Sequence, residues 1–330
     1  MAVNETQNPA GAVPAVTIGV PVYNGEAFLE DALRSALAQT REDLEVVISD
    51  NASTDRTGEI CREYALKDPR VRYFRNAKNL GAAPNYNIAL HHARGRFFKW
   101  LAHDDRILPS YVASTTHALE SRPDAILCNT TVSYIDGSGS QIGLYDSRLG
   151  RADSPSVPGR LAWMILRSHS CVDFFGMFRR SALEGSLQHG SFHGADRALL
   201  AQMAIRGPLL QIAAPLVQMR EHEKRYTRSA GRAIDRAAWH DASLRGRVTF
   251  PTWRLYSEFL KMVKSEAMTS AERMRCYGVL ARWWASNYNA VRAAIDVVAL
   301  VAPGAPAVAE RVKVRLFGAA PGHLAGARRR

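Results

Sequence analysis

The stretch KWLAHDDRILP, residues 99–109, places two adjacent carboxylates, Asp104 and Asp105, directly after an apolar run. An apolar run of this length is typical of a buried strand, so the two charges stand where the strand ends. Paired carboxylates in this position suit three tasks: binding a cation, acid–base chemistry, or capping the helix that follows Pro109. The elements that surround them must decide among the three.

Other polar groups also follow short apolar segments. They are Pro21-Val-Tyr-Asn24, Asp50-Asn51-Ala-Ser53 and Arg75-Asn76. Uncharged amides and carboxylates at strand ends can bind a polar ligand or form turns. Whether they act together depends on whether the strands before them run in the same direction.

The elements that position these groups alternate between strand and helix. We expect strands at 15–20, 44–50, 71–76, 96–102 and 125–135, and helices at 27–39, 53–65, 82–93 and 109–120. Pro21 is expected to end the first strand, and Ser53 to cap the second helix with Asp55 in its first turn. Such alternation predicts a mostly parallel sheet with helices on both faces. Ligands bind outside the carboxyl ends of strands in such sheets, so the polar groups are expected along one edge.

Two common phosphate-binding loops are missing from the sequence. No G-x-G-x-x-G follows the first strand, which disfavours a dinucleotide-binding fold. No G-x-x-x-x-G-K-[ST] is present either, which disfavours a P-loop nucleotide hydrolase.

The alternation stops near residue 150. The Ser- and Pro-rich stretch 151–160 predicts a flexible or acceptor-side loop, and 194–207 predicts a helix with Asp196 near its start. Beyond residue 232 the pattern is helical, with expected helices at 236–247, 252–268, 270–286 and 288–301. We therefore divide the chain into a disordered leader, a sheet domain, and a helical region with a basic tail, at 1–13, 14–230 and 231–330.

The 330 residues are 47% hydrophobic and carry a net charge of +12, with a pI of about 9.8. Nucleic acid, anionic lipid and a nucleotide-type substrate all fit this charge. Residues 220–264 hold eleven Lys or Arg against five Asp or Glu, and residues 303–330 hold six against one. These segments form either a solvated surface and a frayed tail or a contact with a membrane surface. No basic motif with interleaved aromatic residues stands out, so nucleic-acid binding alone is poorly supported.

The compartment is inferred from three features. The N-terminal MAVNETQNPAGAVPA has neither the basic nor the apolar region of a signal peptide. The late apolar run VRAAIDVVALVA is too short to span a bilayer and carries two charges. Four widely spaced cysteines without a C-x-x-C motif favour reduced thiols over a disulfide framework or a zinc site; they are Cys61, Cys128, Cys171 and Cys276. We expect a cytoplasmic protein, with peripheral contact of its basic C-terminal region to the inner face of the membrane as an open alternative.

Four segments, in this order, resemble family 2 glycosyltransferases with the GT-A fold. They are VTIGVPVYNGEAFLEDALRSALAQT, VVISDNASTDRT, NLGAAPNYNIALHHARG and KWLAHDDR. Each motif alone is weakly specific, whereas four in order at suitable spacing form a strong signal. The resemblance covers roughly residues 14–225, about two thirds of the chain. It implies an α/β fold with a Rossmann-like, mostly parallel sheet flanked by helices, a nucleotide-sugar domain over 14–230, and a C-terminal helical extension.

The resemblance implies a donor site at the first two strand ends. The family's first loop, which touches the nucleoside, corresponds to Pro21, Tyr23, Asn24 and Glu26. Asp50 stands where the family has an aspartate that reads the base edge, although a turn-forming role is the alternative. Asn51 replaces the second aspartate common in the family, which keeps the polarity and loses the charge.

A second part of the resemblance is the N-x-G…N…G pattern, which packs against the donor region in the family. It corresponds here to Asn79, Gly81, Asn87 and Gly95. Tyr86 stands where an arginine is usual, and either stacking or core packing would suit it.

The resemblance aligns Asp104 with the last acidic residue of the family's D-x-D motif, and Ala102 occupies the first acidic position. A divalent cation, Mn²⁺ or Mg²⁺, bridges two phosphates and stabilises the departing diphosphate. Because Mg²⁺ often uses only one or two carboxylates plus phosphate oxygens and waters, Asp104 is sufficient in principle. Asp105 is expected to bind sugar hydroxyls or to orient the loop.

A base is also required, because a sugar hydroxyl is a poor nucleophile at neutral pH. The family's Glu-Asp pair at a helix start corresponds to Ala195 and Asp196, so the resemblance implies Asp196 as the base of an inverting single displacement. The alternative role for Asp196 is a carboxylate that interacts with the helix dipole.

The segment QMREHEKRYTRS, residues 218–229, resembles the family's R-x-H…S segment, in which the histidine often contacts the metal or the diphosphate. The resemblance therefore implies His222 as a second metal ligand, and Arg220 or Arg225 as a group that neutralises phosphate. His193 is a candidate for lining the acceptor site because it lies close before Asp196.

The expected function is a metal-dependent inverting glycosyltransferase that uses a UDP- or dTDP-linked sugar. Its expected acceptor is a glycan or a lipid-linked intermediate of cell-envelope or polysaccharide biosynthesis. Two alternatives stay open. A sugar-nucleotidyltransferase would need a Gly-rich first loop with Arg or Lys, which VPVYNGE lacks. A non-catalytic glycan-binding protein on a decayed transferase fold is favoured by Ala102 and Ala195 in the two motif positions.

Overall fold

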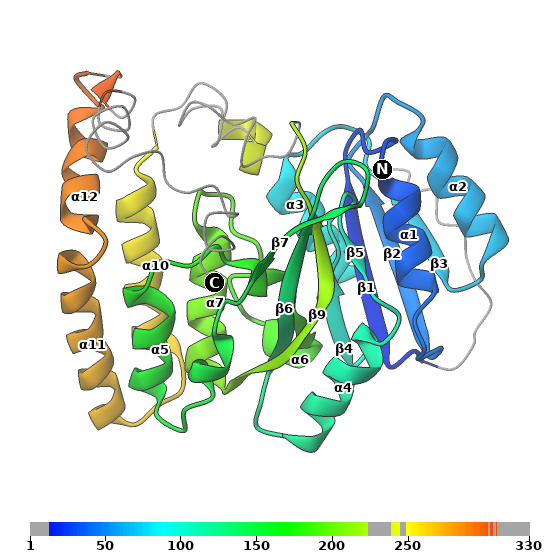
Figure 1. Ribbon diagram of the computed structural model, residues 1–330. Coiled ribbons are helices and arrows are strands. Elements are labelled where there is room, and N and C mark those ends of the chain that lie inside the picture. Colours follow the sequence, from blue (N-terminus) through cyan, green and yellow to red (C-terminus); the bar gives the residue numbers. More distant parts are fainter. Residues whose placement is uncertain (1–12, 224–238, 245–248, 303, 306–307, 309–330) are drawn as a thin grey trace.

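A computed structural model describes residues 13–223, 239–244, 249–302, 304–305 and 308. In this part of the chain, nine strands form one mixed sheet that helices flank on both faces (Figure 1). The strand order is β3-β2-β1-β4-β8-β6-β9-β5, and β7 pairs with β6.

The first half of the sheet is parallel throughout. Its strands are β1 (Val16–Val22), β2 (Leu44–Asp50), β3 (Val71–Arg75) and β4 (Phe97–Trp100). The helices between them are α1 (Leu29–Leu37), α2 (Thr57–Lys67) and α3 (Ala82–His91). The predicted alternation and the predicted GT-A type of α/β sheet are therefore confirmed.

The second half of the sheet mixes directions. The antiparallel β8 (Met177–Arg179) lies between β4 and β6 (Leu127–Ile135), and β9 (Leu209–Arg220) runs parallel to β6. The two-residue β5 (Arg106–Ile107) pairs antiparallel with β9, and β7 (Gln141–Tyr145) with β6. The β5–β9 pairing matters most, because it brings the acidic loop before β5 to the end of β9.

Two hydrophobic cores fill the two faces of the sheet. Successive side chains of a strand point to opposite faces, so Phe97 joins one core and Phe98 the other. The remaining helices in the first two thirds of the chain are α4 (Tyr111–Ser121), η1 (Leu149–Ala152), α5 (Val157–Leu166), η2 (Val172–Phe175), α6 (Arg180–Leu183) and α7 (Ala195–Arg206).

The C-terminal helices are α10 (Pro251–Ser265), α11 (Ser270–Ala285) and α12 (Asn289–Val298), after the short η3 (Ala242–Leu244). Of these, α10 and α11 contribute residues to the core that holds Phe98. Phe259 and Trp283 are buried in the core that also holds Trp100 of β4. In Figure 1 these helices stand beside α5 and α7, on the side away from α1 and α2. None of the helices in the described ranges has the length and apolar character that crossing a membrane requires.

Three local predictions are wrong. The stretch 151–160, expected as a loop, contains the end of η1 at Ala152 and the start of α5 at Val157. The first strand does not end at Pro21, because β1 continues to Val22. Val22 accepts a hydrogen bond from the Asn51 amide on the β2 side, so the Pro21 nitrogen faces β4, where the ladder has already ended at Gly19. The second helix begins at Thr57, and the Ser53 hydroxyl accepts a hydrogen bond from the Asn24 amide and does not cap the helix. Half of the expected helix over 236–247 lies outside the described residues, and the described half, 239–244, ends in a short 3₁₀ helix at Ala242–Leu244.

Lys99 of β4 is fully buried beneath the acidic loop. Its ammonium donates to the carbonyl of Phe175 and lies 4.6 Å from the ring centre of Tyr111. Burial lowers the pKa of Lys99 to about 7, and the charge of Asp105 acts in the opposite direction. Lys99 therefore titrates in the folded protein several pH units below its range in the unfolded chain.

Replacing Lys99 with Met is expected to flatten the pH dependence of stability above pH 7. Between about pH 7 and 10 the unfolded chain binds the lysine proton and the folded chain does not. The free energy of unfolding of the wild type therefore rises with pH, by at most about 1.4 kcal/mol per pH unit from this group. Urea unfolding at pH 7 and pH 9 measures the difference. Lys264→Met, at an exposed lysine, is the control; equal slopes in Lys99→Met and the wild type would contradict the prediction.

Candidate active site

Asp104 and His222 meet although 118 residues separate them in the chain. His222 Nε2 lies 2.9 Å from Asp104 Oδ2, and both side chains stay partly accessible, at 16% and 13% exposure. Asp104 precedes β5 and His222 follows β9, so the pairing of Arg106 with Gln218 in the sheet brings them together. The structure thus places the two predicted metal ligands in contact.

The side chain of Arg220 holds the loop that carries Asp104 in place. Its buried guanidinium donates to the backbone carbonyl of Asp104 at 3.0 Å and forms an ion pair with Asp31 at 2.9 Å. It also lies over the ring of Phe28, 4.6 Å from the ring centre. These contacts make Arg220 a positioning residue for Asp104. Arg225, the other expected phosphate-binding arginine, lies outside the described residues.

Asp105 is buried next to Asp104. Its Oδ1 accepts a hydrogen bond from the Arg220 amide at 2.9 Å, so this carboxylate joins the acidic loop to the end of β9. Of its two expected roles, the contact favours orienting the loop. Neither aspartate caps α4, whose N-cap residue is Ser110.

The donor set at Asp104 and His222 fits a divalent cation held mainly by its substrate. Within the described ranges, no group of three or more His, Cys, Asp or Glu residues could hold a metal ion. Two protein ligands leave most coordination positions for phosphate oxygens and water, as is usual for Mg²⁺ and Mn²⁺ on nucleotides. The imidazole nitrogen favours Mn²⁺ over Mg²⁺, because Mg²⁺ prefers oxygen ligands.

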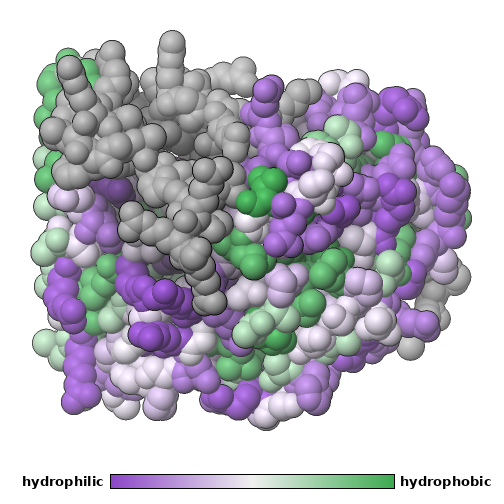
Figure 2. Space-filling model, viewed as in Figure 1, coloured by the Kyte–Doolittle hydropathy of each residue, from purple (hydrophilic) through white to green (hydrophobic). Residues whose placement is uncertain are grey.

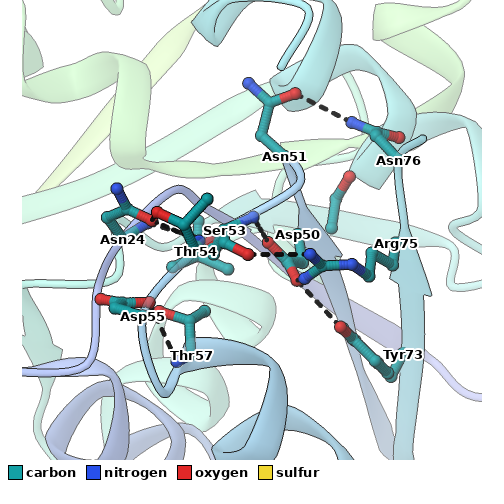
Figure 3. A network of polar contacts seen from close by, with 12 residues as sticks. Asn24, Asp50, Asn51, Ser53, Thr54, Asp55, Thr57, Tyr73, Arg75 and Asn76 are labelled. Atoms are coloured by element: carbon teal, nitrogen blue, oxygen red, sulfur yellow. Dashed lines mark hydrogen bonds and ion pairs between the residues drawn. The ribbon is translucent and has the colours of Figure 1, made fainter. Parts of the chain in front are cut away.

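A second polar network lies at the end of β2 (Figure 3). Asp50 is fully buried and accepts hydrogen bonds from the Ser53 amide at 2.8 Å and the Tyr73 hydroxyl at 2.9 Å. Arg75 forms an ion pair with the same carboxylate. The sequence did not indicate Tyr73 or Arg75 as partners, although the parallel register sets Asp50 opposite Arg75. These contacts fix the carboxylate at the carboxyl end of the strand.

Asn51 is the centre of the network beside Asp50. Its amide nitrogen donates to Asn79 Oδ1 at 2.9 Å and to the Gly81 carbonyl at 3.0 Å. Its amide oxygen accepts from the Leu80 amide at 2.9 Å and from Asn76 Nδ2 at 3.1 Å. All hydrogen-bonding positions of the buried Asn51 side chain are used. Two of these contacts, to Asn79 Oδ1 and to the Gly81 carbonyl, need a hydrogen-bond donor at position 51. This explains why an amide stands where the family has a carboxylate.

Replacing Asn51 with Asp, the residue common in the family, is expected to destabilise the protein by about 1–3 kcal/mol. The new carboxylate would turn an oxygen toward two oxygens that now accept hydrogen bonds, in a buried site. Urea unfolding at pH 7 measures the free energy of unfolding. The variant should regain stability as the pH falls toward 4, because the protonated acid can donate. An unchanged midpoint at pH 7 would show that the network tolerates an acceptor.

The first loop is bound to the loop before α2. The Asn24 amide donates to Ser53 Oγ at 2.9 Å, and Asn24 Oδ1 accepts from the Thr54 amide at 2.8 Å. Glu26 accepts from the Arg56 amide at 3.0 Å. Tyr23 is 43% exposed at this edge, whereas Pro21 is buried within β1. Asn24 and Glu26 therefore shape the loop, and Tyr23 is the expected donor-contact residue that it presents to solvent.

Asn87 of α3 lies away from the Asn51 network. Its amide group makes two hydrogen bonds to the backbone of His189, at 2.9 and 3.0 Å. It therefore ties α3 to the segment that leads into α7. Gly81, at the start of α3, has a φ of +94°, and an added Cβ would lie 2.7 Å from the backbone of Asp241. Only glycine fits there.

Asp196 lies in the first turn of α7, after Gly194 with a φ of +93°. Its carboxylate accepts the Arg197 amide at 2.8 Å. Burial, together with the charge of Arg197, lowers the pKa of the nearby His169 to about 4, and burial also lowers the pKa of His189. Both imidazoles are therefore neutral at pH 7. Because α7 leads directly into β9, its start faces the edge at which β9 ends.

A family model described as glycosyl transferase family 2 matches residues 17–186, just over half of the chain. The chain is 33% identical over 117 residues to EpsJ of Bacillus subtilis, an uncharacterized glycosyltransferase, covering 35% of this chain and 34% of EpsJ. It is 36% identical over 97 residues to the glycosyltransferase GlyA of Streptococcus pneumoniae, covering 29% of this chain and 14% of GlyA. The chain thus spans about a third or less of these curated relatives.

Solved structures share the fold at low sequence identity. The fragment 1–349 of S. aureus TarS has a TM-score of 0.60 and 15% identity, covering 91% of this chain and 84% of that one. The same fragment has been solved with UDP-GlcNAc. The mannosyltransferase PcManGT of Pyrobaculum calidifontis, in complex with GDP-Man and Mn²⁺, has a TM-score of 0.55 and 21% identity, covering 93% and 81%. These likenesses extend over about nine tenths of this chain.

Proposed function

The chain belongs to glycosyl transferase family 2, and we propose that it moves a sugar from a nucleotide-sugar donor to a hydroxyl group of an acceptor. The acceptor class we propose is a glycan or a lipid-linked intermediate of cell-envelope or polysaccharide biosynthesis. The reaction is a single displacement that inverts the anomeric centre. A UDP- or dTDP-linked donor is proposed. Two similar folds bind nucleotide sugars: TarS has been solved with UDP-GlcNAc, which supports a uridine donor, and PcManGT with GDP-Man, a guanosine donor.

The observation that carries the proposal is the contact between Asp104 and His222 at the carboxyl edge of the sheet. An ion pair that is partly open to solvent contributes little to stability, so folding alone gives little reason for this contact. Arg220 and Asp105 hold the loop so that Asp104 and His222 keep one face toward solvent. This arrangement supports a site for a diphosphate and its cation.

The residues of the chain divide the chemical work. Asp104 and His222 would hold Mn²⁺ or Mg²⁺, which stabilises the departing diphosphate when it is bound. The loops fixed by Asp50 and Asn51 form the nucleoside side, with Tyr23 at the rim. Asp196 accepts the proton of the acceptor hydroxyl as that oxygen attacks the anomeric carbon. His169 and His189 are neutral at pH 7, so neither forms an ion pair with the Asp196 carboxylate.

Calorimetric titration of UDP, dTDP and GDP, each with and without Mn²⁺, tests the proposal. We expect one nucleotide to bind the wild type with Mn²⁺, and Asp104→Asn to lose that metal-dependent binding. Binding that is equally tight without metal would remove the cation from the proposal. Absence of binding for all three nucleotides would favour the glycan-binding protein on a decayed transferase fold.

We also propose a peripheral contact with the inner face of an anionic membrane. Apolar side chains stay exposed on α12 and just after it: Val291, Val297, Val298, Leu300 and Val301. The sequence that follows, residues 303–330, has a net charge of +5 and lies almost entirely outside the described residues. Apolar side chains next to basic ones suit a surface that offers both acyl chains and negative headgroups.

Deleting residues 303–330 is expected to weaken binding to vesicles that contain phosphatidylglycerol, because each basic residue near such a surface contributes about 1 kcal/mol. Co-sedimentation of the wild type and the deletion variant measures the bound fraction. Vesicles of phosphatidylcholine alone serve as the control and should bind neither protein. Equal binding of both proteins to the anionic vesicles would show that residues 303–330 are an ordinary solvated tail with no role in membrane binding.

A further inference from the structure

A cavity of about 340 Å³ lies between β7, the end of α5 and the segment that leads into η2. It is separate from the Asp104–His222 site and has no role in the reaction as proposed above. Its walls include the side chains of Tyr145, Arg148, Trp163, Arg167, His169 and Asp173. In Figure 1, α5 and β7 lie on the same side of β6 as α7. A volume of this size accommodates one sugar ring or a group of similar size.

Asp173 is the most informative residue of the cavity wall. It is 1% exposed, and burial raises its pKa to about 6. The side chains of Asn129 and Ser147 donate to the same oxygen, Oδ1, at 2.9 and 3.0 Å. Among the described residues, Oδ2 therefore receives no hydrogen bond from another side chain. A buried carboxylate with one oxygen left over is costly for folding, and it suits a ligand that donates hydrogen bonds.

The polar surroundings of Asp173 extend behind the cavity wall. Asn129 Oδ1 and Ser170 Oγ are buried outside the cavity lining and have no hydrogen-bond partner among the described residues. The hydroxyl of Tyr145 accepts the Ser170 amide at 3.1 Å, which fixes the ring at the cavity wall. Unsatisfied buried polar groups of this kind are few in folded proteins and call for a specific explanation.

The charges of the cavity favour a neutral ligand. Two arginines, Arg148 and Arg167, face two carboxylates, Asp146 and Asp173, among the residues that line it. A phosphate or another anion would meet the carboxylates as well as the arginines. The cavity offers hydrogen-bond donors from arginines and acceptors from carboxylates, beside the ring of Trp163. Groups of these kinds bind the hydroxyls and the C–H groups of a sugar. Arg167 lies 3.8 Å above that ring, which holds its guanidinium at the wall.

Arg197, the residue after the expected base Asp196, connects α7 to the cavity wall. The guanidinium of Arg197 donates to the backbone carbonyls of Arg167 at 3.1 Å and His169 at 2.9 Å. The side chain of Arg197 therefore holds the cavity wall next to the start of α7, where Asp196 lies. His169 lines the cavity and interacts electrostatically with Asp196. An acceptor whose hydroxyl reaches Asp196 would place its next sugar unit in this direction.

We propose that the cavity binds a neutral sugar ring of the acceptor, one unit away from the hydroxyl that reacts. The inference rests on the proposed function, because it names part of the substrate of the same reaction. Asp173 Oδ2 and the guanidinium of Arg148 bind hydroxyl groups of that ring, and Trp163, with Arg167 stacked on it, forms the wall beside it. The cavity thus selects an acceptor with at least two sugar units.

Saturation-transfer NMR with the methyl glycosides of glucose, galactose, mannose and N-acetylglucosamine tests this, using the full chain. Asp173→Asn keeps the acceptor at Oδ1 and changes only the second oxygen into a donor, so the fold should survive. Arg148→Ala, at an exposed position, is a second variant in case the first one unfolds. Arg282→Ala, at an exposed arginine of α11, is the matched control.

We expect at least one glycoside to bind the wild type and Arg282→Ala, and to bind Asp173→Asn and Arg148→Ala at least about tenfold more weakly. No binding of any glycoside, or equal binding to all four proteins, would overturn the proposal. So would displacement of the glycoside by inorganic phosphate at equal concentration, because that result indicates an anion site. The nucleotide titrations are independent: glycoside binding without nucleotide binding would leave the sugar site and remove the transferase function.

Discussion

Asp104→Asn is expected to lower the rate of sugar transfer by about 10³-fold or more and to leave the protein folded. Metal-bound charge stabilisation is worth several kcal/mol at a departing diphosphate, and about 1.4 kcal/mol corresponds to a factor of ten. Ala102 occupies the other acidic position of the motif, so the chain offers no second carboxylate there to replace Asp104. The variant keeps its size, and the backbone contacts of Arg220 to this loop do not require the charge.

Release of the nucleoside diphosphate from a panel of UDP-, dTDP- and GDP-sugars measures this effect. Asp124→Asn, at an exposed aspartate, is the matched control and should keep full activity. His222→Ala should reduce the rate less, because one oxygen ligand remains. Turnover of Asp104→Asn within about twofold of the wild type would remove the metal role from this residue.

Asp196→Asn is expected to lose transfer by about 10²- to 10⁴-fold while it binds the nucleotide with unchanged affinity. A positioned base contributes an effect of that size, and an amide cannot accept the proton of the acceptor hydroxyl. Asp196 lies on α7, whereas the nucleotide loops lie on β1 and β2, so donor binding should not depend on it. Rates of transfer and calorimetric affinities must be measured on the same protein.

The alternative for Asp196 gives a different result. A carboxylate that only interacts with the dipole of α7 would cost about 0.3–1 kcal/mol of stability when it is neutralised, with transfer unchanged. Full transfer by Asp196→Asn would therefore identify a helix-stabilising residue, and the base would have to be sought elsewhere.

The sequence was sufficient for the elements whose hydrophobic pattern is long and regular. The strand at 44–50 and the helix at 194–207 agree with β2 and α7 to within one residue at each end. Ser53 and Pro21 show where local signals fail. Ser53 has the right chemistry for a helix cap, but its hydroxyl is used by the Asn24 amide, a contact that forms only in the folded chain. Pro21 is tolerated because the neighbouring strand has already ended.

The candidate site was predicted unevenly for a related reason. The expectation that Asp104 and His222 share a site came from the family resemblance, and no residue pattern predicted the two-residue β5 that joins them. Two residues carry no periodicity, and neither β7 nor β8 was expected. Partners such as Tyr73 and Arg75 depend on the register between strands, which the sequence does not specify.

Because β6 pairs with β9, the part of the chain that folds together extends beyond the part that the family model matches. The family model ends at residue 186, whereas β9 and His222 come after it, as do the core residues Phe259 and Trp283. A fragment that ended at the family boundary would leave the backbone of β6 without its parallel neighbour. Unpaired edges of this kind associate with other chains, so such a fragment would aggregate before it could bind a nucleotide. A fragment that keeps β9 and this core intact therefore has to extend at least through α11.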